Sequence, residues 1–157
     1  MTHTTKKLPA KRVDIVSLKM VKEGSILYEN RRITSPGAAA ELVREFLEDC
    51  DREKFVVAYL NTRNEPTAIH TVSVGTVNSS LVHPREVMKG AILSNATSIL
   101  LSHNHPSGSN VEPSNEDISI TKRLVEAGKL IGIEVVDHII IGGEGRYYSF
   151  KQEGRIK

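Results

Sequence analysis

Apolar and polar positions along the chain predict short strands that are interrupted by helices. The first alternation, at Val13 and Ile15 and further at Leu18 and Met20, predicts a strand in RVDIVSLKMV. A turn at KEGS and a strand in ILYENRRIT are expected to return the chain. A later pair of segments, KFVVAYLN and TAIHTVSVG, flanks the turn TRNEP and predicts a hairpin. The first strand of this hairpin is continuously apolar, so both of its faces are expected to be buried.

Three other segments place their apolar residues at helical spacing. The first is SPGAAAELVREFLEDCD, in which Ser35 is suited to the N-cap and Pro36 to the first helical position. The second is HPREVMKGAILSN, with Pro84 in its first turn, and the third is PSNEDISITKRLVEAGKLIG, closed by Gly132. The predicted buried faces of the first two helices are Ala39, Leu42, Val43, Phe46, Leu47 and Cys50, and Val87, Met88, Ala91 and Ile92.

Three further strands are predicted in TSILL, IEVVDHIIIG and RYYSFK, with GGEG as the turn before the last one. The resulting order, β-β-α-β-β-α-β-α-β-β, alternates helices with strands and also contains hairpins. It predicts an α/β fold, with a mixed sheet flanked by helices in a single domain. That domain is expected to span residues 13–157, after a flexible polar and basic tail at residues 1–12.

Composition narrows the class of protein. The chain has 157 residues, of which 39% are hydrophobic and 25% charged, and this is typical of one globular domain with a real core. Its single cysteine, Cys50, excludes an internal disulfide and a multi-cysteine zinc finger, and is expected to be a small buried hydrophobe. A net charge of +2 and an aromatic content of 4% argue against a nucleic-acid binder. The chain shows no secretory signal and no apolar run of membrane-spanning length, which favours a cytoplasmic location.

The stretch SHNHPSGSN carries the clearest chemical signal. His103 and His105 stand at the end of a predicted buried strand, and residues i and i+2 of an extended segment point to the same side. Asp117 lies in the first turn of the helix that follows, where its carboxylate could face the two imidazoles. Two imidazoles and one carboxylate are the protein ligands of many catalytic zinc sites. Ser114 and Asp117 also form S-x-x-D, a helix-capping signature, and capping is compatible with a ligand role.

These residues resemble a known family. HNHPSG and PSNED, with HPREV upstream and VEAGKLIGIEVVDHIIIG downstream, closely resemble the RadC family of bacterial JAB/MPN-type proteins from Val13 to Phe150. The resemblance implies a cytidine-deaminase-like fold and the JAMM motif of metallopeptidases. It implies one zinc ion per chain held by His103, His105 and Asp117, with Ser114 stabilising an oxyanion. The activity it implies is cleavage of an amide bond in a protein or peptide by a zinc-activated water.

The sequence departs from the family pattern in two places. The spacer between His105 and Ser114, PSGSNVEP, is one residue longer than usual, and the extra residue falls in the turn SGSN. We therefore expect the geometry of the site to deviate there. Longer RadC proteins carry an N-terminal helix-hairpin-helix region. This sequence starts too late to contain that region, so we expect no DNA binding through it.

A hydrolase of this type also needs a carboxylate to take the proton from water. The best match is Glu53, in DREKFVV, although its register against Phe55 is one residue off the usual motif. Its alternative role is a solvated charge in a linker. The rival base is Glu86, in HPREV, which would also suit the first turn of a helix without any chemistry. Glu53 ranks first.

The other histidines, and the other classes of protein considered, are supported by weaker sequence signals. His70, His83 and His138 are expected to be hydrogen-bonded structural residues, and Asp137 and His138 could support the sheet or the site. A non-catalytic MPN-type scaffold and a DNA-repair accessory protein remain as alternatives. Zinc deaminase motifs (H-x-E with P-C-x-x-C) and the thermolysin motif H-E-x-x-H are absent from the sequence.

Overall fold

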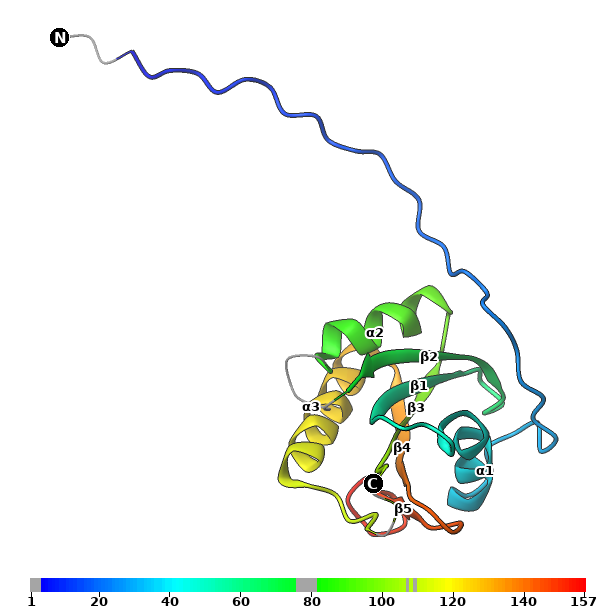
Figure 1. Ribbon diagram of the computed structural model, residues 1–157. Helices are drawn as coiled ribbons and strands as arrows, with labels where there is room; N and C mark the ends of the chain where they lie inside the picture. The colour runs from blue at the N-terminus through cyan, green and yellow to red at the C-terminus, as the bar shows by residue number, and fades with distance from the viewer. Residues whose placement is uncertain (1–3, 76–81, 107, 109) are drawn as a thin grey trace.

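The computed structural model describes residues 4–75, 82–106, 108 and 110–157, and its regular elements begin near residue 36. Figure 1 shows a sheet with helices on both faces and an N-terminal segment that runs away from it. The elements are α1 (Pro36–Leu47), β1 (Lys54–Leu60), β2 (Pro66–Val74), α2 (Pro84–Leu93), β3 (Ser98–Asn104), α3 (Asn115–Ile131), β4 (Glu134–Ile141) and β5 (Tyr147–Ser149).

Within the described ranges, the strands form one mixed sheet in the order β2-β1-β3-β4-β5. The pairs β1·β2, β1·β3 and β4·β5 are antiparallel, whereas β3 and β4 are parallel and are joined through α3. A helical crossover is the usual connection between parallel neighbours. The predicted α/β class, the mixed sheet and the β1–β2 hairpin are confirmed.

The central strands are apolar on both sides because both faces of the sheet are covered. In β1, alternate side chains enter two separate cores, one on the α1 face and one on the face that carries α2 and α3. Phe55, Val57 and Tyr59 point toward α2 and α3, and Val56, Ala58 and Leu60 point toward α1. Burial on two faces explains why this strand reads as one continuous apolar run.

The helix boundaries follow local capping chemistry. Ser35 accepts a hydrogen bond from the Ala38 N–H at the start of α1, and Pro36 occupies the first turn. Ser114 and Asp117 form a reciprocal capping box at the start of α3. Gly132 ends α3 with a φ of 85°, a left-handed conformation that glycine adopts without strain. Each of these boundaries was predicted from sequence.

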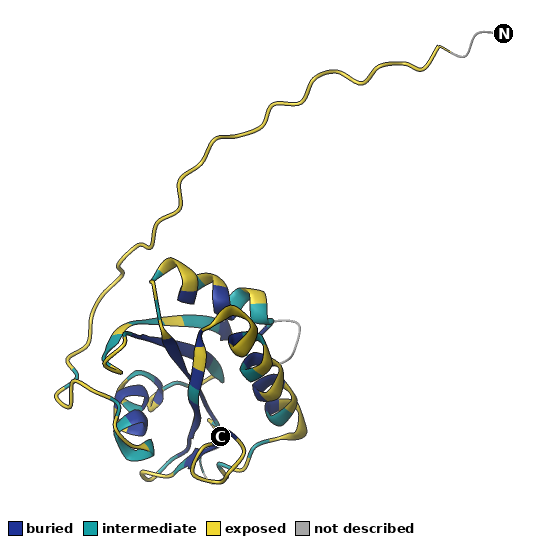
Figure 2. Ribbon diagram, turned by 180° about the vertical axis from the view of Figure 1, so that it is seen from behind, coloured by how far each residue is buried: buried dark blue, intermediate teal, exposed yellow. Residues whose placement is uncertain are grey.

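The two strands predicted in RVDIVSLKMV and ILYENRRIT are wrong. Among the described residues, 4–34 contain no strand, and 4–27 are exposed, as the yellow segment in Figure 2 shows. Ile15, for example, is fully exposed. An alternating pattern forms a strand only where a neighbouring strand supplies hydrogen bonds and a core covers one face, and neither condition is met here. Closer to α1 the chain is held locally, because the Tyr28 hydroxyl donates to the Ala38 carbonyl at 2.8 Å.

Three predictions about buried faces also need correction. Ile92 is 56% exposed, because α2 presents to the sheet only Val87, Met88 and Ala91. Phe46 is partly buried, and Cys50 lies past the end of α1 and is only half-buried. The domain boundary at residue 13 stays a prediction. None of the helices in the described part of the chain combines the length and the apolar character needed to cross a membrane.

Candidate metal centre

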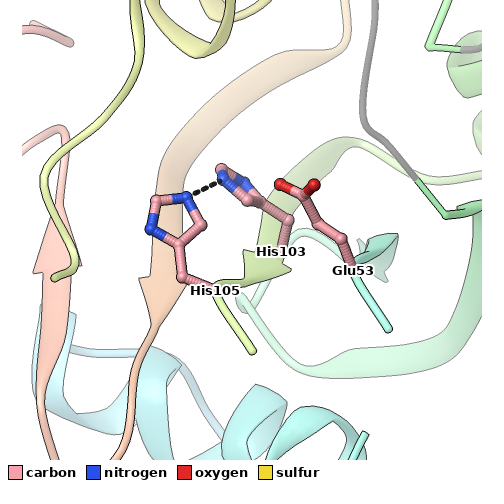
Figure 3. Close-up of side chains that lie close together, drawn as sticks. All are labelled: Glu53, His103 and His105. Carbon is pink, nitrogen blue, oxygen red and sulfur yellow. Dashed lines mark hydrogen bonds between the residues drawn. The ribbon is translucent and has the colours of Figure 1, made fainter. Parts of the chain in front are cut away.

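The candidate site lies where β3 ends and β1 begins. His103 is the second-to-last residue of β3, and His105 follows just after the strand. Their Nε2 atoms are 3.2 Å apart, as the dashed line in Figure 3 marks, so the predicted i, i+2 arrangement places both rings together. Phe55 pairs with His103 in the antiparallel register of β1 and β3. That register brings the residues just before β1 to the same end of the sheet.

Asp117 reaches the same point from the first turn of α3. Its Oδ2 lies 3.4 Å from the Nε2 of His103 and 3.6 Å from the Nε2 of His105. The backbone N–H of Ser114 donates to this Oδ2 at 2.9 Å, and the Ser114 hydroxyl accepts from the Asp117 N–H at 3.1 Å. The capping box therefore fixes the carboxylate at the site, and the capping role and the proximity to the histidines occur together.

These three separations match the edges of a metal-centred tetrahedron. Zinc bonds to imidazole nitrogen and carboxylate oxygen are about 2.0–2.2 Å long, which places tetrahedral ligands roughly 3.3–3.6 Å apart. The observed distances of 3.2, 3.4 and 3.6 Å lie around that range. His103 is fully buried, Asp117 is 4% exposed and His105 is 19% exposed, so the point between them is open on one side. The donor set and its spacing fit a zinc ion.

Glu53 lies beside the two histidines. One oxygen of its carboxylate and one nitrogen from each ring of His103 and His105 all lie within 4.8 Å of one another. Figure 3 shows this carboxylate next to His103 and on the opposite side of it from His105. Glu53 and the two histidines form the group of potential metal-binding side chains found among the described residues. The structure therefore brings the predicted base, Glu53, and the three predicted ligands, His103, His105 and Asp117, to the same end of the sheet.

The backbone around Glu53 is anchored by a residue that the sequence did not single out. Asn104 accepts a hydrogen bond from the Lys54 N–H at 2.7 Å and donates to the Arg52 carbonyl at 2.9 Å. The Gly75 N–H also donates to the Glu53 carbonyl at 2.7 Å. Asn104 lies between the two histidines, and its side chain points to the opposite face of β3. Only the β1·β3 register reveals this contact.

Glu86 lies elsewhere. It sits in the first turn of α2 on the protein surface, and its carboxylate accepts a hydrogen bond from Lys89 at 3.0 Å. That hydrogen bond is the main cause that lowers the pKa of Glu86. Of the two glutamates considered from the sequence, the structure brings Glu53 and not Glu86 to the histidines.

A buried hydrogen-bonded chain lies behind His103. The Nδ1 of His103 is 2.8 Å from the Nε2 of His138, and the Nδ1 of His138 is 2.6 Å from the hydroxyl of Thr121. His138 is fully buried, which lowers its pKa well below the usual value and keeps the ring neutral. Phe150 stacks on the ring of His138 at 4.6 Å. Sequence reasoning suggested a supporting role for His138, but nothing in the sequence pointed to Thr121.

The other predicted structural contacts are also present. The Nδ1 of His70 lies 3.0 Å from the hydroxyl of Tyr59, and the Nδ1 of His83 accepts from the Arg85 N–H at the start of α2. Asp137 accepts hydrogen bonds from its neighbour His138 and from the hydroxyl of Ser149 at 2.6 Å. Burial raises the pKa of Asp137. These residues support the fold around the centre.

Asp117 and His105 each shift the pKa of the other. Burial by itself would raise the pKa of Asp117, but the imidazoles of His103 and His105 beside its carboxylate outweigh burial and hold that pKa well below its usual range. The Asp117 carboxylate is also the main cause that raises the pKa of His105. An ionised carboxylate facing two imidazoles is an arrangement suited to a cation.

His105 is oriented by the loop that follows it. Its Nδ1 lies 2.8 Å from the Asn110 carbonyl oxygen, which can only accept a hydrogen bond. The Nδ1 therefore carries a hydrogen, and in the neutral ring the lone pair of Nε2 faces the centre. Ser107 and Ser109 of the turn SGSN lie outside the described residues, so the expected deviation in this turn stays a prediction.

Comparison with known proteins identifies close relatives. A family model described as the RadC-like JAB domain matches residues 33–155. A UPF0758 protein of Clostridium acetobutylicum is 56% identical over 129 residues, which cover 82% of this chain and 56% of the relative. UPF0758 proteins of Rubrobacter xylanophilus and Methanosarcina mazei are 55% and 47% identical over 79% and 81% of this chain, and over 53% and 55% of their own lengths. The chain spans about half the length of these curated relatives.

Proposed function

Because the chain belongs to the RadC-like JAB domain family, we propose that it is a zinc-dependent hydrolase that cleaves an amide bond in a protein or peptide. His103, His105 and Asp117 would hold the ion. The observation that carries this proposal is the spacing of their three ligand atoms at 3.2, 3.4 and 3.6 Å. Three protein ligands leave a tetrahedral ion one position for water or substrate, which is the arrangement of catalytic zinc sites.

Glu53 is the proposed general base. When bound, the ion would act as a Lewis acid that acidifies a water molecule and polarises the substrate carbonyl. Glu53 takes the proton from the attacking water and then delivers it to the departing amine nitrogen. Its place beside the histidines, with its backbone anchored by Asn104 and Gly75, supports this role.

Ser114 is the proposed donor to the developing oxyanion. Its hydroxyl oxygen accepts from the Asp117 N–H, and a hydroxyl that accepts one hydrogen bond still carries a hydrogen to donate. The capping box fixes this hydroxyl in the same helical turn as the Asp117 carboxylate that would hold the ion. A fixed donor at that point stabilises negative charge in the transition state more than in the ground state.

The proposal is tested with a peptide library derived from a bacterial proteome, with new termini read by mass spectrometry. The zinc-loaded protein is expected to generate cleavage products, and the chelator-treated protein to generate none. Glu53→Gln should bind zinc normally and lose activity about 100-fold or more. Glu86→Gln is the matched control, because it removes a glutamate carboxylate on α2 and should leave both properties unchanged. Equal cleavage by wild type and Glu53→Gln would contradict the proposed base.

A further inference from the structure

The hydrogen-bonded chain behind His103 ends on a group that can only accept. The Thr121 hydroxyl lies 2.7 Å from the backbone carbonyl oxygen of Asp117. A carbonyl oxygen has no hydrogen, so the hydroxyl must donate its single hydrogen to it. The Thr121 oxygen is then available only as an acceptor toward its other close partner, the Nδ1 of His138 at 2.6 Å.

This direction sets the hydrogen positions on both imidazoles. Because the Thr121 oxygen accepts, the Nδ1 of His138 must carry a hydrogen. The ring is fully buried between a hydroxyl and a second imidazole, where a charge would be poorly solvated, so its Nε2 has a lone pair and accepts. The Nδ1 of His103, 2.8 Å away, must therefore carry a hydrogen as well. The lone pair of His103 is left on Nε2, which is the atom that faces His105 and Asp117.

The opposite direction would disable the centre. If Thr121 donated to His138, no hydrogen would lie between the Thr121 and Asp117 oxygens at 2.7 Å, and that short contact would become repulsive. His138 would then donate to His103, and the Nε2 of His103 would carry a hydrogen toward the centre. A protonated Nε2 cannot bind a metal ion, so the two directions predict opposite ligand properties.

The packing around His138 prevents a simple exchange between these states. The ring is fully buried, with Phe150 stacked on it at 4.6 Å and Phe55 edge-on at 5.5 Å. Thr121 is 3% exposed. A buried, close-packed ring cannot turn over without displacing its aromatic neighbours, so its hydrogen-bond partners stay fixed.

We propose that Thr121 and His138 are positioning residues that fix the tautomer of His103, so that the lone pair of its Nε2 is presented to the metal ion. This inference rests on the proposed function, in which His103 is a ligand. It extends that function from the ligands to the chain Asp117 carbonyl, Thr121, His138 and His103. Asp117 would thus act twice, through its carboxylate at the centre and through its backbone carbonyl at the end of the chain.

The first test is made on the metal-free protein. Long-range nitrogen–hydrogen correlation spectra of histidine-labelled protein distinguish the nitrogen that carries a hydrogen from the one that does not. We expect hydrogen on the Nδ1 of both His103 and His138, with a spectrum of His103→Gln to assign the signals. Hydrogen on the Nε2 of His103 would overturn the inference. If the tautomer is as expected but added zinc does not bind, the inference stands and the proposed function fails.

The second test compares two substitutions of Thr121 by titration with zinc against a competing chelator. Thr121→Val removes the hydroxyl and keeps the shape, and is expected to weaken zinc binding about 10–100-fold. Thr121→Ser restores the hydroxyl and is expected to bind zinc within about threefold of wild type. In Thr121→Val, the spectrum should show hydrogen moving to the Nε2 of His103.

Ser102→Ala is the matched control for this test. Its hydroxyl makes a buried hydrogen bond of the same type and length, to the Ile139 carbonyl at 2.7 Å, but Ser102 points to the opposite face of β3. We expect Ser102→Ala to lose stability like Thr121→Val and to keep the affinity of wild type for zinc. Thr121→Val with the zinc affinity of wild type, or Ser102→Ala with the same loss of affinity as Thr121→Val, would overturn the inference.

Discussion

His103 and His105 are two copies of one residue type, one position apart, and the fold holds them in different ways. His103 is fully buried and its Nδ1 meets a side chain of the core, the ring of His138. His105 is partly exposed, and its Nδ1 meets a backbone carbonyl of a loop, that of Asn110. Both arrangements present an Nε2 to the same point, but only the first depends on residues from three separate elements.

Because of this difference, substitutions at the two histidines should affect folding stability and metal binding in different proportions. The core side of the centre, at His103, is part of the packing between β3, β4 and α3, so changes there alter folding and metal binding together. The loop side, at His105, contributes a ligand with few packed neighbours. It is also the side on which the sequence predicts one extra residue, in the spacer PSGSNVEP. Insertions are tolerated in loops, where the backbone can absorb them, and not within a buried strand.

The largest difference is expected between His103→Ala and His105→Ala. Both should abolish stoichiometric zinc binding. In the metal-free protein, His103→Ala should lower the free energy of unfolding by about 2–4 kcal/mol, because it leaves a cavity and strips the Nε2 of His138 of its donor. His105→Ala should cost less than about 1 kcal/mol, as expected for a partly exposed side chain. Urea unfolding measures both values, and equal losses would remove the distinction between the two sides.

A smaller effect is expected from Asn104→Ala, a substitution that tests whether the buried side chain of Asn104 positions Glu53. Loss of two hydrogen bonds to the segment around Glu53 should cost about 1–3 kcal/mol of stability. Hydrolysis should fall about 10-fold or more because the general base is displaced, while zinc affinity stays within about threefold. Activity on the cleaved peptide and a zinc titration give the two readouts.

The control for that prediction is Asn61→Ala. Asn61 also makes two hydrogen bonds to backbone, accepting from the N–H groups of Arg63 and Glu65 in the β1–β2 turn. It should lose stability and keep its rate of hydrolysis. If both asparagine variants lose activity in proportion to stability, Asn104 has no specific role in placing Glu53.

The smallest effect is expected from Asn110→Ala. The contact with His105 uses the backbone carbonyl, which the substitution keeps, and only the hydrogen bond from the Glu112 N–H to the Asn110 side chain is lost. Zinc affinity should change less than about threefold, since a loop can readjust around one lost side-chain hydrogen bond. A loss of zinc affinity as large as that of Thr121→Val would show that the loop constrains His105 as strictly as the core constrains His103.

The sequence revealed the local parts of this centre and not the parts that depend on strand register. The i, i+2 spacing of the histidines and the S-x-x-D capping signature are local, so both could be predicted, and the family pattern pointed to Glu53. Thr121 meets His138 only where α3 packs on β4, and Asn104 reaches the segment around Glu53 only through the pairing of β3 with β1. The alternation near Val13 predicted a strand that the structure lacks, because an alternating pattern carries no information about whether a neighbouring strand is present.

The most direct test of the centre is anomalous diffraction at the zinc edge, from crystals grown with one equivalent of zinc. We expect a single strong peak about 2.0–2.2 Å from the Nε2 of His103, the Nε2 of His105 and the Oδ2 of Asp117. Glu53 should lie outside bonding distance of that peak, within reach of a water molecule. A peak bonded to Glu53 in place of Asp117, or no peak at this point, would show that these three side chains are not the ligands.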